Sequence, residues 1–274
     1  MRRALGTRVT TVRARFRAER NLAGWKRDQR IALPSGLDPD RMPVIFCTWR
    51  RLGRLERTLK MLAEQDTPVQ ALIWNNSPDR ATVDAAAAAA EIPVIVHHSA
   101  RNIGSFARFY LARELAEAGH RSVVIIDDDQ DFGPSAVSDL VRGYRPRSLS
   151  GWWAFRFLSN RYGDKVRAEP GERASCVGPG GMIADTGVFR DRRLYRCPRR
   201  FWFVDDIWLC YVAAHLCDYD LFRSSAHFEV VEDEHALFRT LGRTRHKMQY
   251  YLIRKGWDPV RRGSSPELGC DDLG

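Results

Sequence analysis

The central part of the chain holds four short apolar segments, each of which ends abruptly in polar residues. An apolar run without polar alternation, such as Val123–Ile126, is typical of a strand that is buried on both faces of a sheet. Such strands need a covering layer on each side. The four predicted strands are Val44–Thr48, Ala71–Trp74, Pro93–His97 and Val123–Ile126.

Helical patterns separate these strands. Leucines recur at helical spacing from Leu52 to Leu62, Thr82–Glu91 contains a run of alanines, and Ile103–Leu111 has its apolar residues on one face. Strands that alternate with helices predict an α/β fold with a mainly parallel sheet and helices on both faces. The elements predicted in the less regular second half are strands over 151–157 and 227–231, a glycine-rich turn at 178–181 that leads into a further strand, and a helix over 207–216.

Polar clusters follow three of the predicted strands, at Thr48–Arg51, Asn75–Ser77 and Asp127–Asp131. In an open α/β sheet, ligands bind beyond the carboxyl ends of the strands, so we expect these clusters to face one crevice. No Gly-x-Gly-x-x-Gly motif follows the first strand, so the usual dinucleotide-binding fingerprint is excluded.

Four carboxylates follow the fourth strand, at Asp127, Asp128, Asp129 and Asp131. Carboxylates at such spacing oppose one another's ionisation, and a bound divalent cation usually stabilises their charged form. Oxygen ligands suit Mg2+, Mn2+ or Ca2+ better than zinc. Asp127 and Asp129 directly follow the buried strand and are the favoured pair, although Asp129 and Asp131 have the same spacing. The alternative is an acidic loop that only caps the next helix.

Basic residues are concentrated at the two ends of the chain, whose formal net charge is +10 at pH 7. Residues 1–31 have a net charge of +8 and residues 239–274 one of +4, so the central part is slightly acidic. This distribution argues against a nucleic-acid groove through the body of the protein. We therefore expect no nucleic-acid partner.

Apolar residues in the basic N-terminal segment recur at helical spacing, at four positions between Leu5 and Phe16. This pattern is typical of an amphipathic helix, and one role of such a helix is peripheral contact with an anionic membrane surface through residues 1–31. The alternatives are a helix packed on the domain and a partly disordered arm, because Thr10 and Thr11 lower the helix propensity.

The chain of 274 residues, 44% of them hydrophobic, is long enough for one large domain. No apolar run approaches the roughly 20 residues that span a bilayer, and no hydrophobic segment follows Arg2 and Arg3. The six cysteines show no Cys-x-x-Cys spacing and are expected to be free thiols in a reducing compartment. We therefore expect a cytoplasmic protein whose contact with the inner face of the membrane, if any, is made by residues 1–31.

Four motifs together resemble a known family. In order and spacing they are similar to the exostosin-like hexosaminyltransferases and, more distantly, to the family-2 glycosyltransferases, which are nucleotide-sugar-dependent enzymes of the GT-A fold with its Asp-x-Asp motif. The resemblance implies a GT-A-like (Rossmann-like), mainly parallel sheet flanked by helices, with a less regular C-terminal acceptor half. The four motifs are Thr48–Arg51, Ile73–Asn76, Asp127–Asp129 and Asp205–Ile207.

The resemblance covers residues 43–240, which we expect to form the glycosyltransferase domain. A basic N-terminal segment and linker, 1–42, would precede it, and a basic C-terminal extension, 241–274, would follow it.

The resemblance also implies roles for single residues. Asp129, with Asp127, would ligate Mn2+ or Mg2+, and His235 or His246 would be a third ligand, although a lone histidine is more often structural. Family-2 enzymes usually have an acidic residue at the position of Asn75–Asn76, which leaves the nucleotide base open, and asparagines also form plain turns. The residues expected to bind the donor nucleotide are Thr48, Arg51, Asn75, Asn102, Arg108, Asp127 and Asp128.

Asp205 and Asp206 follow an aromatic run and precede a predicted helix. By the resemblance, they are the catalytic carboxylates, and Asp206 faces the acceptor hydroxyl or the anomeric carbon. Asp206 would be the general base of an inverting enzyme, or would position the acceptor or stabilise positive charge in a retaining one, which the exostosin-like match favours. The alternative is that one of the two carboxylates is the N-cap of the helix.

Three further features of the second half have two interpretations each. Trp153 and its neighbours would stack on a sugar or fill the core. Residues 178–181 would let the backbone approach the donor sugar or would only form a tight turn. The basic residues between Arg239 and Lys247 would hold the diphosphate or form a solvated helix face.

Together these patterns predict a metal-dependent hexosyl- or hexosaminyltransferase. It would move a sugar from a nucleotide-diphosphate sugar, with a UDP-sugar favoured, to a glycan or lipid-linked acceptor. One alternative is a sugar-phosphate nucleotidyltransferase, although the Thr48–Arg51 segment lacks the glycines that such enzymes favour after the first strand. The other alternative is a non-catalytic membrane or nucleic-acid adaptor that depends on residues 1–31.

Overall fold

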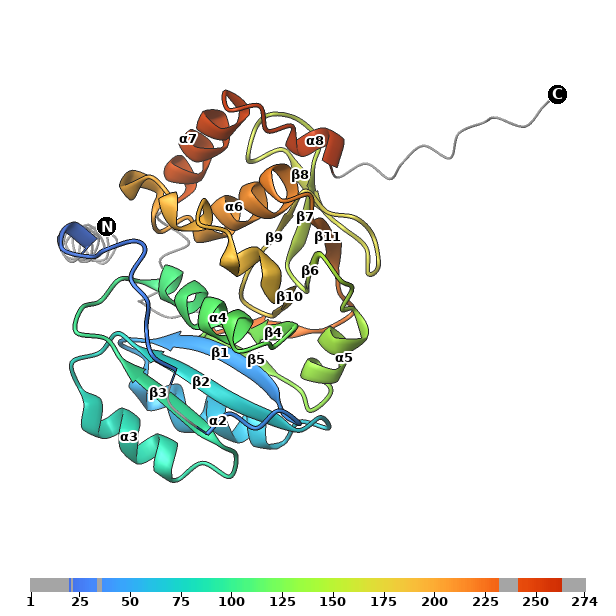
Figure 1. Ribbon diagram of the computed structural model, residues 1–274. Helices are drawn as coiled ribbons and strands as arrows, with labels where there is room; N and C mark the ends of the chain where they lie inside the picture. Colours follow the sequence, from blue (N-terminus) through green and yellow to red (C-terminus); the bar gives the residue numbers. More distant parts are fainter. Residues whose placement is uncertain (1–19, 21, 34–35, 232–240, 263–274) are drawn as a thin grey trace, which may run out of the picture.

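A seven-stranded sheet runs through the molecule (Figure 1). The computed structural model describes residue 20 and residues 22–33, 36–231 and 241–262. Across the sheet, the strands are β11 (Asp220–Arg223), β6 (Ser148–Gly151), β10 (Met182–Asp185), β4 (Ser122–Ile125), β1 (Met42–Thr48), β2 (Val69–Asn75) and β3 (Val94–His98).

The sheet is mainly parallel, as predicted. β1 pairs in parallel with β2 and β4, β2 with β3, and β6 with β11, whereas β10 is antiparallel to both of its neighbours. The chain reaches β10 through the glycine-rich turn, where Gly181 has a φ of 76°. A left-handed residue of this kind reverses the chain at little cost only if it is glycine. The predicted parallel strands correspond to β1, β2, β3 and β4.

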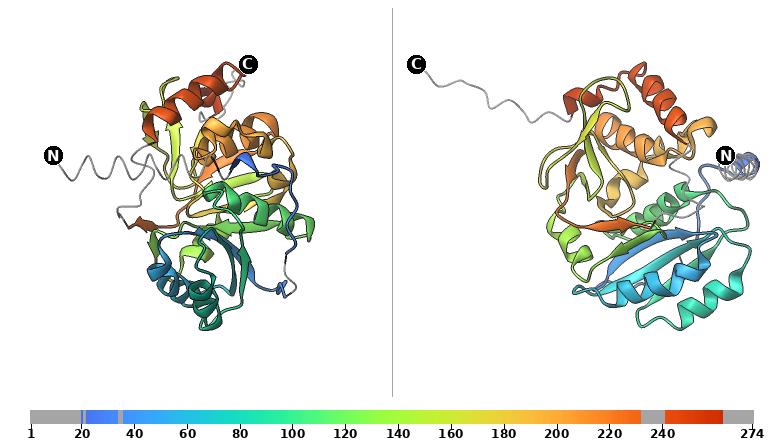
Figure 2. Two further views of the ribbon diagram at one scale, coloured as in Figure 1. Left: turned by 90° about the vertical axis from the view of Figure 1, so that its left-hand side faces the viewer. Right: turned by 180° about the vertical axis from the view of Figure 1, so that it is seen from behind.

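Both faces of the sheet are buried, because successive residues of β1 enter different cores. Ile45 belongs to the core beneath α4 and α6, while Val44 and Phe46 belong to the core beneath α2 and α3. Figure 2 shows these layers from the side and from behind. The α-helices are α2 (Leu55–Ala63), α3 (Arg80–Ala88), α4 (Arg108–Glu117), α5 (Ala136–Arg142), α6 (Asp205–Cys210), α7 (Gly242–Ile253) and α8 (Pro259–Arg262).

Two of the predicted helices are observed with different bounds, and short 3-10 helices complete the helical elements. The helix predicted over 207–216 is observed as α6 and the π-helix η6 (Tyr211–Leu216). The helix predicted over 82–91 begins earlier, because the Asp79 carboxylate caps α3 by accepting from the Thr82 backbone N–H. The 3-10 helices are η1 (Leu52–Arg54), η2 (Ser105–Ala107), η3 (Thr186–Arg190), η4 (Leu194–Arg196) and η5 (Arg199–Phe201).

Two smaller sheets accompany the central sheet. The strand predicted over 151–157 is divided, because the chain leaves the central sheet after Gly151 and re-enters a small sheet at Ala154. Gly151 lies so close to its neighbours that a Cβ would be 2.6 Å from Val177. The strands of the small sheets are β8 (Lys165–Arg167), β7 (Ala154–Phe157) and β9 (Cys176–Val177) in one, and β12 (Phe228–Val230) and β5 (Gln130–Phe132) in the other.

The described part of the N-terminal segment packs on the domain. Leu22 and Ile31 are buried, and the indole of Trp25 donates to the Tyr110 hydroxyl of α4 over 2.8 Å. The positions between Leu5 and Phe16, which carry the amphipathic pattern, lie outside the described residues.

At the other end of the chain, α7, within the segment expected as a C-terminal extension, packs on α6 and η5. No helix among the described residues is long and apolar enough to cross a membrane. The five described cysteines are free, and three of them are buried.

Candidate active site

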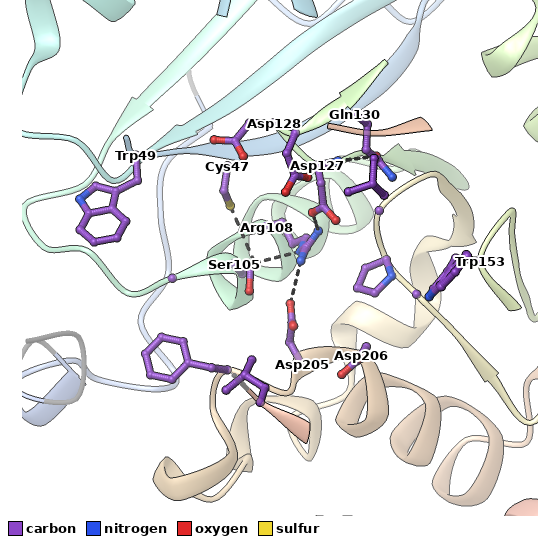
Figure 3. Close-up of a pocket in the computed structure, with 18 of the residues that line it drawn as sticks. Cys47, Trp49, Ser105, Arg108, Asp127, Asp128, Gln130, Trp153, Asp205 and Asp206 are labelled. Carbon is purple, nitrogen blue, oxygen red and sulfur yellow. Dashed lines mark hydrogen bonds and ion pairs between the residues drawn. The ribbon is translucent and has the colours of Figure 1, made fainter. Parts of the chain in front are cut away.

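A cavity of about 640 Å3 lies at the carboxyl ends of β1 and β4, between the central sheet and the second half of the chain (Figure 3). Its sheet side is lined by residues 47–51, Asn76, residues from the Asn102–Arg108 segment and residues 127–130. Its other side is lined by residues of the β7–β8 hairpin, the turn before β10, the start of α6 and Arg245 of α7. The predicted convergence of the polar clusters on one crevice is observed.

Arg108 joins the two sides of the cavity. Its guanidinium donates to Asp127 over 2.6 Å and to Asp205 over 2.9 Å, as the dashed lines in Figure 3 show. Burial by itself lowers the pKa of Arg108, but the two carboxylates more than offset this effect, and the net pKa is raised. Arg108 is therefore a permanent cation beneath the site.

Asp205 is the buried member of this arrangement. Burial raises its pKa above the usual range, and the neighbouring Arg108 offsets only part of that rise. Asp205 is almost fully buried, and its carboxylate forms an ion pair with Arg108. It therefore holds the Arg108 side chain in position at the site. It does not act as an N-cap, since Val204 occupies that position of α6.

Asp206, the next residue, lines the cavity beside Arg245. Its Oδ2 lies 3.5 Å from the Arg245 Nε, and its Oδ1 accepts from the Ile207 backbone N–H over 2.9 Å. Both acids lie in the first turn of α6, where the helix dipole favours negative charge. Adjacent positions on one helix thus bring two carboxylates to the cavity, one paired with Arg108 and the other beside Arg245.

The carboxylates of the acidic loop after β4 form ion pairs with two separate groups of arginines. Arg51 pairs with Asp128 over 3.0 Å and with Asp129 over 3.2 Å at the cavity. Asp131 pairs with Arg57 and Arg54 outside the cavity lining, and its pKa is lowered chiefly by the hydrogen bond from Arg57. Of the two registers left open by the sequence, the pair that includes Asp127 therefore lies at the cavity.

The two asparagines after β2 have different positions. Asn75 is fully buried and does not line the cavity: its side chain accepts from the Ser77 backbone N–H over 2.7 Å and lies 3.0 Å from the Nδ1 of His98. Asn76 lines the cavity and donates to the Gly104 carbonyl over 3.2 Å. Of the two asparagines, Asn76 is the one that lines the cavity, although its amide oxygen also accepts from Trp74 and Ile103, and the contact of Asn75 with the nucleotide stays a prediction.

Thr48 and Asn102, both predicted to contact the nucleotide, line the cavity. The Thr48 hydroxyl is buried and has no hydrogen-bond partner among the residues that the structure describes. A buried hydroxyl without a partner is unfavourable, so a ligand atom at this position would be stabilised. Asn102 accepts from the Gly104 backbone N–H over 2.9 Å, which shapes the loop before α4.

The glycine-rich turn approaches the acidic loop closely. A Cβ at Gly180 would lie 2.1 Å from Oδ2 of Asp127, so only glycine leaves this oxygen its present place. The Gly180 carbonyl accepts from the indole of Trp152 over 2.8 Å, and Gln130 accepts from the Asp127 backbone N–H over 2.9 Å. The turn thus fits closely around a carboxylate, and an approach of the same backbone to the donor sugar stays a prediction.

The carboxylates fit a hard divalent cation that shares its coordination with a ligand. Asp127 keeps an accessible carboxylate at the cavity, beside the space that Gly180 leaves open. Within the described part of the chain, no group of three His, Cys, Asp or Glu side chains forms a complete metal site. Mg2+-type sites often use only one or two carboxylates, with substrate phosphates and water as the other ligands. Asp127 and Asp129 meet that requirement.

The two histidines considered as a third ligand are not among the described cavity residues. His235 lies outside the residues that the structure describes. His246 is on α7, with its ring 5.7 Å from that of Tyr162.

Comparison with known proteins relates the fold to a class of enzymes. No protein-family model matches the sequence, and no curated protein does either. The mannosyltransferase PcManGT from Pyrobaculum calidifontis, in complex with GDP-Man and Mn2+, is similar over 96% of this chain and 75% of its own, with a TM-score of 0.54 and 18% identity. S. aureus TarS 1-349 is similar over 70% of this chain and 60% of its own, with a TM-score of 0.50 and 16% identity. The chain has a GT-A-like glycosyltransferase fold.

This GT-A-like fold confirms the predicted fold class. The cavity also contains residues that the sequence did not single out. Among them are Gln130 within the acidic loop, and Phe155, Tyr162 and Lys165 of the β7–β8 hairpin. No spacing or motif marks them, because the hairpin reaches the cavity only through tertiary packing.

Proposed function

We propose that this protein is a glycosyltransferase that moves a sugar from a nucleotide-diphosphate sugar to a hydroxyl of a glycan or lipid-linked acceptor. The observation that carries the proposal is the arrangement of carboxylates around Arg108: Asp127 and Asp129 on the strand side of the cavity, and Asp206 on the opposite wall, supported by Asp205. The GT-A-like fold and the GDP-Man bound by PcManGT support a nucleotide-sugar donor.

The donor would lie along the strand ends. The unpartnered Thr48 hydroxyl, with Asn76 and Asn102, would contact the nucleoside, and Arg51 would face the diphosphate. Asp127 and Asp129 would hold Mn2+ or Mg2+, which supplies Lewis-acid neutralisation of the departing diphosphate. A guanidinium is well suited to paired phosphate oxygens, so Arg51 would add to that neutralisation. We favour a UDP-sugar from the exostosin-like motifs.

The acceptor would enter between Asp206 and the β7–β8 hairpin. Of the two carboxylates at the start of α6, Asp205 is ion-paired with Arg108 and Asp206 is not, so Asp206 would be the group that acts on an acceptor hydroxyl. With inversion of configuration, it would take the proton of the hydroxyl; with retention, it would orient the hydroxyl toward the donor. Arg245, whose Nε lies 3.5 Å from Oδ2 of Asp206, would hold the carboxylate in alignment.

The direct test is nucleotide binding followed by turnover. The thermal stability of the purified protein is measured with UDP, GDP, CDP and TDP, each with and without Mn2+. A ligand at about 100 times its Kd stabilises the folded state by about 2.7 kcal/mol, so the preferred nucleotide should stand out. The sugar nucleotides of that base are then tested for release of nucleoside diphosphate. If no nucleoside diphosphate stabilises the protein, the proposal is wrong.

The same assay separates the two rival functions. A sugar-phosphate nucleotidyltransferase would consume nucleoside triphosphate and sugar phosphate and release pyrophosphate. An adaptor would show neither reaction, and its binding to anionic vesicles or duplex DNA would be lost with residues 1–31 and weakened by salt. In our proposal those residues give only peripheral contact with the membrane, and transfer of the sugar does not depend on them.

A further inference from the structure

Lys165, on β8, lines the cavity and is held against two aromatic rings. Its Nζ lies 4.1 Å from the ring centroid of Phe155 and 3.8 Å from that of Tyr162. Phe155 is on β7, and Tyr162 lies in the connection from β7 to β8. Ring faces attract a cation, so the ammonium group is positioned without a carboxylate partner.

The pairing of Lys165 differs from that of most arginines in the cavity wall. Arg51, Arg108 and Arg245 each form an ion pair with at least one carboxylate, whereas Arg50 lies over the ring of Trp49. In the described ranges of the chain, no carboxylate forms an ion pair with Lys165. Burial lowers the pKa of Lys165, and the nearby Asp206 offsets only part of this effect. A partly desolvated cation of this kind is stabilised when an anionic group binds to it.

Lys165 lies on the side of the cavity where we propose that the acceptor binds. Asp206 and Arg245 act electrostatically on Lys165, and they belong to the wall opposite the acidic loop. Trp153 lies on the same side, with its ring 5.1 Å from that of Phe155 and 44% of its surface exposed. An exposed tryptophan face offers the flat apolar surface on which a sugar ring stacks.

We infer that the acceptor is anionic. Lys165 binds a carboxylate or phosphate group of the acceptor while a sugar ring of the same molecule stacks on Trp153, which brings its hydroxyl to Asp206. This inference rests on the proposed glycosyltransferase function and narrows its acceptor to acidic glycans or phosphate-bearing glycolipids. Both classes of acceptor carry a negatively charged group next to a sugar ring.

The test compares matched neutral and anionic glycosides with the wild-type protein. The binding of p-nitrophenyl glucuronide and p-nitrophenyl glucoside is measured by calorimetry, with the stabilising nucleoside diphosphate and Mn2+ present. Glucose 6-phosphate methyl glycoside and methyl glucoside form a second pair, which separates a phosphate from a carboxylate. At least one anionic member should bind roughly tenfold more tightly than its neutral partner, the scale of one charge-assisted hydrogen bond.

Variants test whether Lys165 causes the preference for the anionic ligand. Lys165→Met should bring the anionic ligand to the affinity of the neutral one, while Lys165→Arg should retain most of the preference. Lys60→Met removes the same charge from an exposed position on α2 and should change nothing. The inference is overturned if the wild type shows no preference in either pair, if it binds neither pair, or if Lys165→Met weakens neutral and anionic ligands equally. A failure of the proposed function is seen separately, because nucleoside diphosphates would then not stabilise the wild type.

Discussion

The guanidinium of Arg108, at the start of α4, lies 2.9 Å from the carboxylate of Asp205, at the start of α6. The two residues are 97 positions apart in the sequence and both nearly fully buried. Their ion pair joins the first half of the chain to the second at the wall of the cavity.

Replacing Arg108 should therefore destabilise the whole domain. Arg108→Met leaves Asp205 buried without its counter-ion, and removal of one partner from such a pair costs about 3–5 kcal/mol. Arg108→Lys keeps the charge but cannot bridge Asp127 and Asp205 with one planar group, so a smaller loss is expected. Urea unfolding at pH 7 measures both. A loss below about 1 kcal/mol for Arg108→Met would show that the pair is not a structural link.

Substitutions of Asp205 and Asp206, the adjacent carboxylates of α6, should have different effects. Asp206→Asn should leave nucleotide affinity unchanged and lower the rate of sugar transfer by about 10²–10⁴-fold, the range attributed to a positioned acid or base. Asp205→Asn, its matched control, should lower stability because Arg108 loses a partner. Thermal shift with nucleotide and a transfer assay report the two quantities. A fall in donor affinity with unchanged turnover of bound donor would contradict the role of Asp206.

Metal affinity should depend on Asp129 and not on Asp131. Asp129→Ala removes a carboxylate at the cavity and should weaken Mn2+ binding by about tenfold or more, since even supporting groups of metal sites contribute that much. Asp131→Ala loses its pairs with Arg54 and Arg57 outside the cavity and should bind Mn2+ normally. Calorimetric titration with Mn2+ in the presence of nucleotide gives the comparison. Equal losses in both variants would contradict the assignment.

Acid should weaken one ion pair remote from the cavity. Arg193, 2.6 Å away, lowers the pKa of Asp191 to about 2. A lowered folded-state pKa stabilises the protein above the unfolded pKa of about 3.9 and loses that contribution as pH falls toward 2. Because Arg193 is half exposed, Asp191→Asn should cost only about 1 kcal/mol at pH 7. Urea unfolding of both proteins should show this difference shrinking by pH 3; a constant difference would contradict the assignment.

The sequence predicted those parts of the fold whose causes are local. The apolar runs that became β1, β2 and β4 are buried on both faces, so hydrophobicity alone marked them, whereas β3 is a half-buried strand at the edge of the sheet. Polar residues at strand ends converge in any sheet of this kind, so Thr48 and Asp127 were placed at the cavity from sequence. The antiparallel direction of β10 was not predicted, because it depends on where the turn through Gly181 sends the chain.

The parts that were missed depend on single-residue geometry or on distant partners. Neighbouring residues at a strand end point to opposite sides, so the sequence could not show that Asn76 and not Asn75 lines the cavity. The pairing of Arg108 with Asp205 and the approach of Lys165 to Asp206 join segments that no motif relates. Such contacts arise only when the two halves of the domain pack together.

The pairing of β5 with β12 has a consequence for the order of folding. β5 immediately follows the acidic loop, and its partner lies almost a hundred residues later, with the Val231 backbone N–H donating to the Asp129 carbonyl over 2.7 Å. Closing so long a loop is entropically costly and slow, so the nucleotide half can form its parallel strands well before this contact exists. During synthesis, the acidic loop therefore acquires its final conformation only after β12 has emerged from the ribosome. A nascent chain that ends before β12 would have most of the central sheet and no competent site.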